Sequence, residues 1–169
     1  MEFYGRIYRQ YARDPHPALE LAMAWLADNA PARQQTCLVH GDYRLGNVIF
    51  DGQGLVSVLD WELAHLGDPM EDLGYIFVQA WRFGRVELPL GGLAGREPFL
   101  AAYEKAGGFC PTPDALRYWE IFGNFKWAVI TILQAAPFLT GQSRDIELAS
   151  LGRKTAEVEL QILALLETA

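Results

Sequence analysis

The stretch HGDYRLGNVIFDGQGLVSVLDWELAHLGDPMED, residues 40–72, decides how this chain of 169 residues folds and which chemistry it can carry. It contains two β-prone runs, NVIF and LVSVLD, separated by the turn DGQG. Asp51-Gly52 between apolar runs is a strong signal for a β-hairpin. Because a hairpin folds the chain back on itself, we expect Asn47 at its beginning and Asp60 at its end to lie side by side.

Three polar side chains lie in one loop between the β-prone run TCLVH and this hairpin: His40, Asp42 and Asn47. Phosphoryl transfer needs positioning and cations that spread the charge of the phosphates. Hard Mg²⁺ prefers oxygen ligands, which the Asn47 amide and the Asp60 carboxylate offer. Asp42 can face an acceptor hydroxyl and take its proton. HGD or DWE alone is more typical of a capped or solvated turn, but all elements in order favour a phosphotransferase site.

Outside this stretch the chain is mostly helical. Apolar residues recur at helical spacing, and Pro or Gly residues separate the periodic segments. We predict an α+β fold, mostly α, in which a helical bundle carries the small hairpin with its catalytic and metal loops, as a single domain over residues 1–169. An alternating βαβ pattern is absent, which argues against a doubly wound sheet. The expected helices cover residues 2–12, 17–29, 67–81, 96–106, 113–136 and 144–167, with a loop over 84–95.

Composition excludes several classes of function. The formal charge is −7 and Lys and Arg form no run, so binding to nucleic acid or to an anionic membrane is not expected. Cys37 and Cys110 show no metal-ligand spacing, and we expect two reduced, buried thiols. The amino-terminal segment does not read as a signal peptide, and no apolar run is long enough to span a bilayer. We therefore expect a cytoplasmic protein.

Two segments together resemble a known family. HGDYRLGNVIF is similar to the catalytic loop, and VLDWELAHLGDPMEDLGYI to the metal loop and following helix, of the aminoglycoside phosphotransferase/choline kinase family. The spacing D-x-x-x-x-N is also that of the protein-kinase catalytic loop. Within the family, the sequences HGDYRLGN and LDWELAHLGDP are most similar to the branch fused to, or encoded beside, acyl-CoA dehydrogenases. That branch is thought to phosphorylate hydroxylated acyl-CoA compounds. The specific match covers roughly residues 36–80.

The resemblance implies the C-terminal, large lobe of a protein-kinase-like fold and a role for each matching residue. Asp42 would be the catalytic base, and Asn47 and Asp60 would be ligands of Mg²⁺. His40 would be a structural residue that braces the catalytic loop. ATP would be the co-substrate.

Three more residues have two interpretations each. Asp72 resembles a helix carboxylate that holds the catalytic loop through backbone N–H groups, but a first-turn helix acid favoured by the helix dipole explains it equally well. Glu62 could contact a second metal ion or the substrate, or be a polar turn residue. Arg44 could contact a phosphate or substrate anion, although a surface salt bridge is the simpler interpretation.

The family pattern is incomplete in this sequence. The amino-terminal, nucleotide-binding lobe of the family has a glycine-rich loop and a Lys paired with a Glu, yet the only glycine before position 36 is Gly5. The lysines are Lys105, Lys126 and Lys154, all in the second half. We therefore expect this lobe to be absent and ATP binding by the chain alone to be weak. A lobe expressed alone, a split or truncated gene and a degenerate protein are the three explanations.

The sequence supports two main hypotheses of function. The first is the C-terminal lobe of a small-molecule O-phosphotransferase, incomplete or inactive alone, acting on a hydroxyacyl-CoA-like or aminoglycoside-like molecule with a second lobe in cis or trans. The second is a non-catalytic, pseudokinase-like binding or interaction module. A metal-dependent hydrolase is a weaker third, because the His/Asp clusters of such sites are missing. An uncovered apolar face would promote association, so we expect a homodimer.

Overall fold

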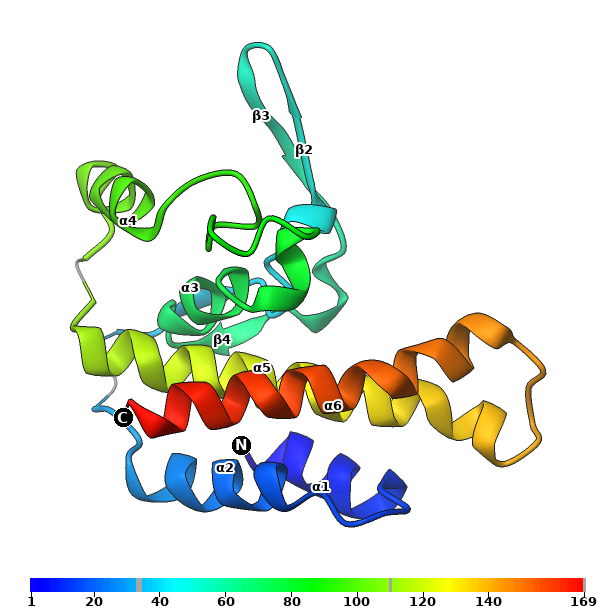
Figure 1. Cartoon of the computed structure of the whole chain (residues 1–169). Helices are drawn as coiled ribbons and strands as arrows, with labels where there is room; N and C mark the ends of the chain where they lie inside the picture. The colour runs from blue at the N-terminus through cyan, green and yellow to red at the C-terminus, as the bar shows by residue number, and fades with distance from the viewer. Residues whose placement is uncertain (33–34, 110, 169) are drawn as a thin grey trace. The chain divides into compact units, whose positions relative to one another are not determined.

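The computed structural model describes residues 1–32, 35–109 and 111–168. These residues form two compact units, Met1–Ala30 with Ile121–Ala169 and Pro31–Glu120, and helix α5 runs from one into the other. The α-helices, shown in Figure 1, are α1 (Glu2–Tyr11), α2 (Pro17–Asp28), α3 (Met70–Ile76), α4 (Arg96–Lys105), α5 (Pro113–Leu139) and α6 (Ile146–Glu167). The strands are β1 (Cys37–Val39), β2 (Val48–Asp51), β3 (Gly54–Val58) and β4 (His65–Gly67).

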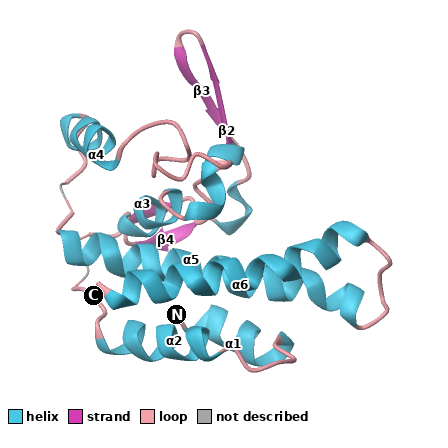
Figure 2. Ribbon diagram, in the orientation of Figure 1, coloured by secondary structure: helices cyan, strands magenta, loops and turns pink. Residues whose placement is uncertain are grey.

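The first unit contains helices only in its described residues, as Figure 2 shows. Helix α2 buries Leu19, Met23 and Leu26, whose spacing puts them on one helical face. Helices α5 and α6 are joined by a buried hydrogen bond of 2.8 Å between the hydroxyl groups of Thr131 and Thr155. The helical periodicity of the sequence therefore predicted these elements correctly.

The second unit contains two small antiparallel sheets and the decisive stretch of sequence. The hairpin predicted around Asp51-Gly52 is present, with β2 paired to β3, and Asp51 Oδ1 accepts the Gln53 N–H at 2.7 Å in the turn. Figure 1 shows this hairpin projecting from the helices of its own unit. Strand β1 pairs with β4, a pairing that the sequence did not predict because β4 has only three residues.

Helix α3 is shorter than the helix expected over residues 67–81. Pro69 is the N-cap of α3, and the side chain of Asp68 just before it accepts the Met70 N–H at 3.0 Å. Beyond Ile76, Trp81 Nε1–H donates to the Tyr75 carbonyl at 2.9 Å, and Arg82 donates to a carbonyl further on at 2.7 Å. The predicted continuation of the α-helix to residue 81 was wrong: after Ile76 the backbone bonds tighten to i→i+3, as in Val78 N–H to the Tyr75 carbonyl, and Gln79–Arg82 form a separate 3-10 turn.

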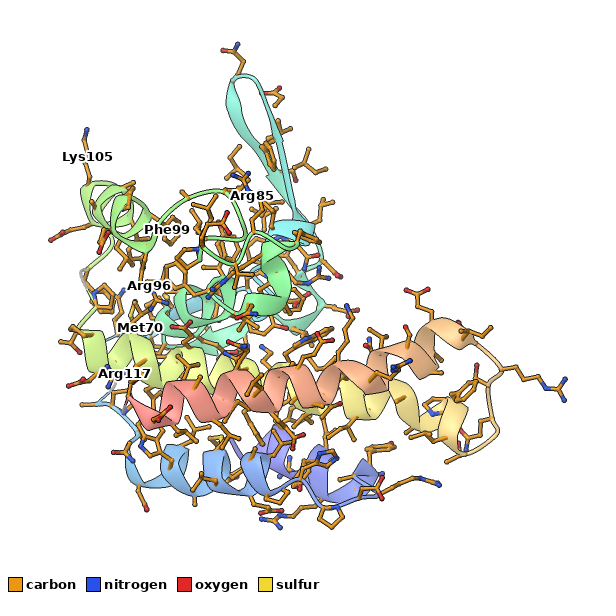
Figure 3. The ribbon with its side chains drawn as sticks, in the orientation of Figure 1. Met70, Arg85, Arg96, Phe99, Lys105 and Arg117 are labelled. Carbon is orange, nitrogen blue, oxygen red and sulfur yellow. The ribbon has the colours of Figure 1, made fainter. Side chains whose placement is uncertain are left out.

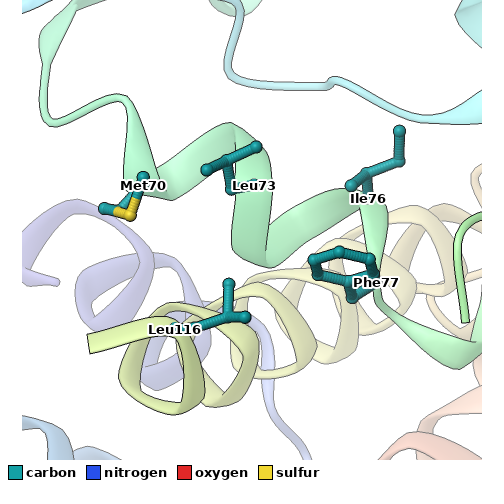
Figure 4. Packing of buried hydrophobic residues seen from close by; sticks show 5 residues of the cluster. All are labelled: Met70, Leu73, Ile76, Phe77 and Leu116. Carbon is teal, nitrogen blue, oxygen red and sulfur yellow. The ribbon is translucent and has the colours of Figure 1, made fainter. Parts of the chain in front are cut away.

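The core of the second unit fixes the helix that carries Asp72. Figure 4 shows its centre, which consists of Met70, Leu73, Ile76, Phe77 and Leu116. Phe99 of α4 packs edge-on against Phe77 at 5.8 Å between ring centroids. At the other end of α4, Lys105 points away from α3 and takes no part in this core (Figure 3). Gly74 lies so close to the backbone of Trp119 that a Cβ atom would collide with it. Asp72 therefore sits on a helix with little freedom to shift.

Two sequence-based expectations concern the cysteines and the membrane. Cys37 is free, as expected, but it is partly exposed and not buried, because it lies at the first position of a short strand in a two-stranded sheet. Cys110 lies outside the described residues. Over the described ranges, every helix is too short or too polar to cross a bilayer.

Candidate active site

The carboxylate of Asp72 anchors the loop that follows β1. Asp72 Oδ2 accepts the backbone N–H of His40 at 2.7 Å, and Asp72 Oδ1 accepts that of Gly41 at 2.9 Å. Gly41 has a φ of +80°, which glycine adopts without steric cost, and a Cβ atom there would collide with the Leu63 carbonyl. Asp72 thus accepts bonds from the catalytic loop while standing in the first turn of α3, so both sequence interpretations describe its position.

The ring of His40 connects this loop to the end of the hairpin. Its Nε2 lies 2.8 Å from the Leu59 carbonyl, and its Nδ1 lies 3.1 Å from the backbone nitrogen of Asp42. A carbonyl only accepts and a backbone N–H only donates, so the ring is neutral, with its proton on Nε2. His40 is 3% exposed, and the Trp61 ring packs on it at 4.5 Å between centroids. The buried imidazole therefore joins residues 42, 59 and 61.

Asp42 and Asn47 are in direct contact. The Asn47 amide nitrogen donates to Asp42 Oδ2 at 2.7 Å and to the Asp42 carbonyl at 2.9 Å. Arg44 Nε lies 3.3 Å from Asp42 Oδ1 and 3.2 Å from Oδ2. The carboxylate is therefore held on two sides and keeps one orientation. In this structure Arg44 makes a salt bridge within the chain, the simpler of its two sequence interpretations.

Asp60 follows directly after Leu59, the residue whose backbone contacts Asn47. The Leu59 N–H donates to the Asn47 carbonyl at 2.8 Å, so the hairpin brings residues 47 and 59 together. Asp60 has φ +67° and ψ +55°, in the left-handed region that Asp and Asn tolerate better than most residues. Asp60 and Glu62 are both exposed. Within the described residues, hydrogen bonds join Asp42 to Asn47 directly and reach position 60 only through Leu59.

The oxygen atoms of this arrangement suit Mg²⁺. Because the Asn47 nitrogen faces Asp42, its Oδ1 is on the other branch of the amide and is turned away from that carboxylate. No group of three or more His, Cys, Asp or Glu side chains in the described ranges could hold a metal ion by itself. Mg²⁺ accepts such a sparse site, because it usually takes one or two carboxylates and completes its shell with water and phosphate oxygens.

Two aromatic residues at the site were given no part in the catalytic and metal loops predicted from the sequence. Trp61 covers His40, and Trp81 lies under Arg44 with the guanidinium carbon 5.1 Å from the ring centroid. Gly46 leaves room for the same guanidinium, since a Cβ atom there would collide with it. The available signal was a tryptophan directly after Asp60 in a polar turn. No local signal pointed to residue 81, because the fold alone brings it to the loop.

Burial raises the pKa of Asp72 above its ordinary value of 3.8, and its two backbone hydrogen bonds only partly oppose this effect. The folded state therefore binds this proton more tightly than the unfolded state. The stabilising contribution of this proton is complete below pH 3.8 and is lost as the pH rises through the folded-state pKa of Asp72.

The Asp72→Asn variant does not titrate at this position. We therefore expect the unfolding free energy of the wild type minus that of Asp72→Asn to fall over that pH window. Urea unfolding monitored by tryptophan fluorescence, from below pH 3.8 to neutrality, measures it. A difference that grows with pH would contradict the assignment.

Comparison with known proteins places this geometry in context. A family model described as "Phosphotransferase enzyme family" matches residues 5–119. Acyl-CoA dehydrogenase family member 10 of Mus musculus is 46% identical over 166 residues, which are 92% of this chain and 15% of that protein. Acyl-CoA dehydrogenase family member 11 of Rattus norvegicus is 38% identical over 173 residues, 91% of this chain and 22% of that protein. The chain thus spans less than a quarter of either relative.

A solved structure agrees at the level of the fold. It is described as a putative aminoglycoside phosphotransferase from Ralstonia eutropha and superposes with a TM-score of 0.81 at 24% sequence identity. The match covers 99% of this chain and 54% of that chain. The kinase-like fold expected from the sequence is therefore confirmed.

Proposed function

This chain belongs to the phosphotransferase enzyme family, and we propose that it supplies the large, C-terminal lobe of an enzyme that transfers the γ-phosphoryl group of ATP to a hydroxyl group of a small molecule. One observation carries the proposal. The Asp42 carboxylate is fixed by the Asn47 amide and the Arg44 guanidinium, in a loop that Asp72 holds through two backbone N–H groups.

Asp42 would act as the base of this reaction. Its side chain is 15% exposed, so it is shielded from bulk water and still accessible to an acceptor hydroxyl. The contacts with Arg44 and Asn47 fix the carboxylate before substrate arrives, which lowers the reorganisation needed during transfer. Asp42 would take the hydroxyl proton as the new P–O bond forms and the bond to ADP breaks.

Asn47 and Asp60 would hold Mg²⁺, Asn47 through Oδ1 and Asp60 through its carboxylate. When bound, the ion would supply the positive charge that offsets the phosphate oxygens. The hydrogen bond between the Leu59 N–H and the Asn47 carbonyl holds together the chain segments just before β2 and just after β3, which carry the two donors. The left-handed backbone at Asp60 sets the direction of its carboxylate independently of β3.

A nucleotide-binding lobe, in cis or trans, would complete the enzyme. Support comes from the hairpin, where Ile49, Phe50, Leu55 and Val56 are 45%, 56%, 64% and 59% exposed. Contiguous exposed apolar residues of this kind are typical of surfaces that a partner covers. A second copy of the chain is the alternative occupant, and it would produce the homodimer that the sequence suggests.

The acceptor we favour is a hydroxylated acyl-CoA thioester. The support is that the relatives at 46% and 38% identity are both named acyl-CoA dehydrogenase family members. An aminoglycoside is the second candidate, because the solved structure is described in those terms. The solved structure shares a lower sequence identity with this chain than the two dehydrogenase family members do, which favours the thioester as acceptor.

The test uses the chain together with a nucleotide-binding lobe of the family, supplied in cis or in trans. A hydroxyacyl-CoA should gain the mass of one phosphoryl group in the presence of ATP and Mg²⁺, whereas the matched acyl-CoA without the hydroxyl should not. Asp60→Asn preserves a side chain that tolerates the left-handed backbone and removes the charge. It should raise the Mg²⁺ concentration for half-maximal rate by about tenfold or more.

Kanamycin is the comparison acceptor. Phosphorylation of kanamycin in preference to the thioester would reverse the choice of substrate and leave the reaction in place. Absence of ATP-dependent transfer to both acceptors, with the protein folded, would contradict the proposed acceptor classes.

A further inference from the structure

A cleft of about 520 Å³ lies against the loop residues 40 and 43 in the second unit. Four aromatic rings line it, Tyr43, Trp61, Phe99 and Tyr103, and we call it the aromatic cleft. Cys37, Ala102 and Asp72 are also in its wall. Its described lining contains none of Asp42, Asn47 and Asp60, although it shares His40, Trp61 and Asp72 with the surroundings of those residues. Its volume is in the range of pockets that hold small molecules.

The charge in the aromatic cleft has one sign. Asp72 is the ionisable carboxylate of its described wall, and no Lys or Arg is among those lining residues. Both Asp72 oxygens already accept backbone N–H groups, so they satisfy the loop and do not need a ligand. Burial, with the nearby charges of Asp72 and Asp68, raises the pKa of the Cys37 thiol. A neutral thiol and the one carboxylate of the wall favour an uncharged or cationic ligand and disfavour an anion.

We propose that the aromatic cleft is a binding site for a neutral or cationic aromatic small molecule, distinct from the site of phosphoryl transfer. The tyrosine, tryptophan and phenylalanine rings offer flat apolar faces and edges for stacking. The hydroxyl groups of Tyr43 and Tyr103 add hydrogen-bonding capacity, and burial raises the pKa of both, so they stay protonated at neutral pH. The phosphates of a nucleotide or of coenzyme A meet no cation in this described wall.

A ligand in the aromatic cleft would contact the supports of the catalytic loop. His40 lines the cleft and bonds Leu59 and Asp42, while Asp72 lines it and holds the His40 and Gly41 N–H groups. Trp61 lines it too and stacks on His40. The occupant would therefore influence the order of the loop without touching Asp42. The inference does not rest on the proposed reaction, because its test measures binding alone.

Two dyes with the same ring skeleton test the charge and the shape. N-Phenyl-1-naphthylamine is neutral, and 8-anilinonaphthalene-1-sulfonate adds one sulfonate to that skeleton. Fluorescence titration of the 169-residue chain should show saturable binding of one neutral dye per chain. The sulfonate should bind at least about tenfold more weakly, a difference of roughly 1.4 kcal/mol.

Two neighbouring alanines of α4 give matched variants. Ala102 lines the aromatic cleft and Ala101 does not, and both are exposed, so a tryptophan at either position leaves the core intact. Ala102→Trp should weaken binding of the neutral dye at least about tenfold by filling the space. Ala101→Trp should bind it as the wild type does.

Cysteine chemistry locates the bound dye. The neutral dye should slow alkylation of Cys37 by iodoacetamide, read by peptide mass spectrometry, in the wild type and Ala101→Trp but not in Ala102→Trp. Equal binding of both dyes, unchanged binding in Ala102→Trp, or unprotected Cys37 at saturation would each overturn the proposal. Circular dichroism matching the wild type shows that loss in Ala102→Trp does not come from unfolding.

Discussion

Asp42→Asn should lower the rate of phosphoryl transfer by about 10²–10⁴-fold, the range expected when a general base is removed. The substitution keeps the size of the side chain and an oxygen that can face Arg44, so folding should be nearly unaffected. Because the loss would be in the chemical step, kcat should fall while the KM for ATP stays close to that of the wild type. Initial rates of acceptor phosphorylation at varied ATP concentration, with the nucleotide-binding lobe present, give both values.

Asp51→Asn is the matched control for this experiment. Asp51 is an exposed turn residue of the hairpin and accepts only a local N–H from Gln53. Its replacement should leave the transfer rate within about twofold of the wild type. If Asp42→Asn behaved in the same way, Asp42 would not be the base, and the non-catalytic interaction module suggested by the sequence would gain support.

Gly41→Ala should reduce the free energy of unfolding by about 2–5 kcal/mol, for two separable reasons. Its φ of +80° is strained for any residue with a Cβ atom. The new Cβ would also collide with the Leu63 carbonyl, a backbone atom that cannot rotate away. Urea unfolding measures the loss.

Gly84→Ala separates the two causes. Gly84 has nearly the same φ, +85°, but a Cβ atom there meets nothing within 4 Å. It should lose only the conformational part, about 1–2 kcal/mol. Equal losses at positions 41 and 84 would show that the Leu63 carbonyl can move and that the loop is less tightly enclosed than its geometry implies.

Local signals explain which elements the sequence predicted. The turn at Asp51-Gly52 and the helical spacing of apolar residues each act over a few residues, so they are visible without the fold. The hairpin predicted that Asn47 and Asp60 lie side by side with Asp42 near them. Asp42 and Asn47 are 2.7 Å apart, whereas the bond that reaches toward position 60 is made by the backbone of Leu59. The kinase-like fold followed from the same stretch.

Features that depend on distant segments could not be predicted. The pairing of β1 with β4, the end of α3 and the Trp81 ring under Arg44 arise only when the chain is folded. Cys37 illustrates the point, because composition favoured a buried thiol whereas its place in a small sheet leaves it partly exposed. The aromatic cleft likewise combines residues from α3, α4 and the loop that share no sequence pattern.

The backbone at Asp60 limits how this lobe can change during evolution. Its positive φ admits Asp, Asn and Gly far more readily than branched or bulky side chains. A descendant that abandons magnesium chemistry while keeping its shape should therefore carry Asn or Gly at this position. Asn or Gly at position 60 would therefore indicate that the metal ligand was lost while the turn was kept, whereas Val or Ile there would indicate that the backbone of the turn had changed.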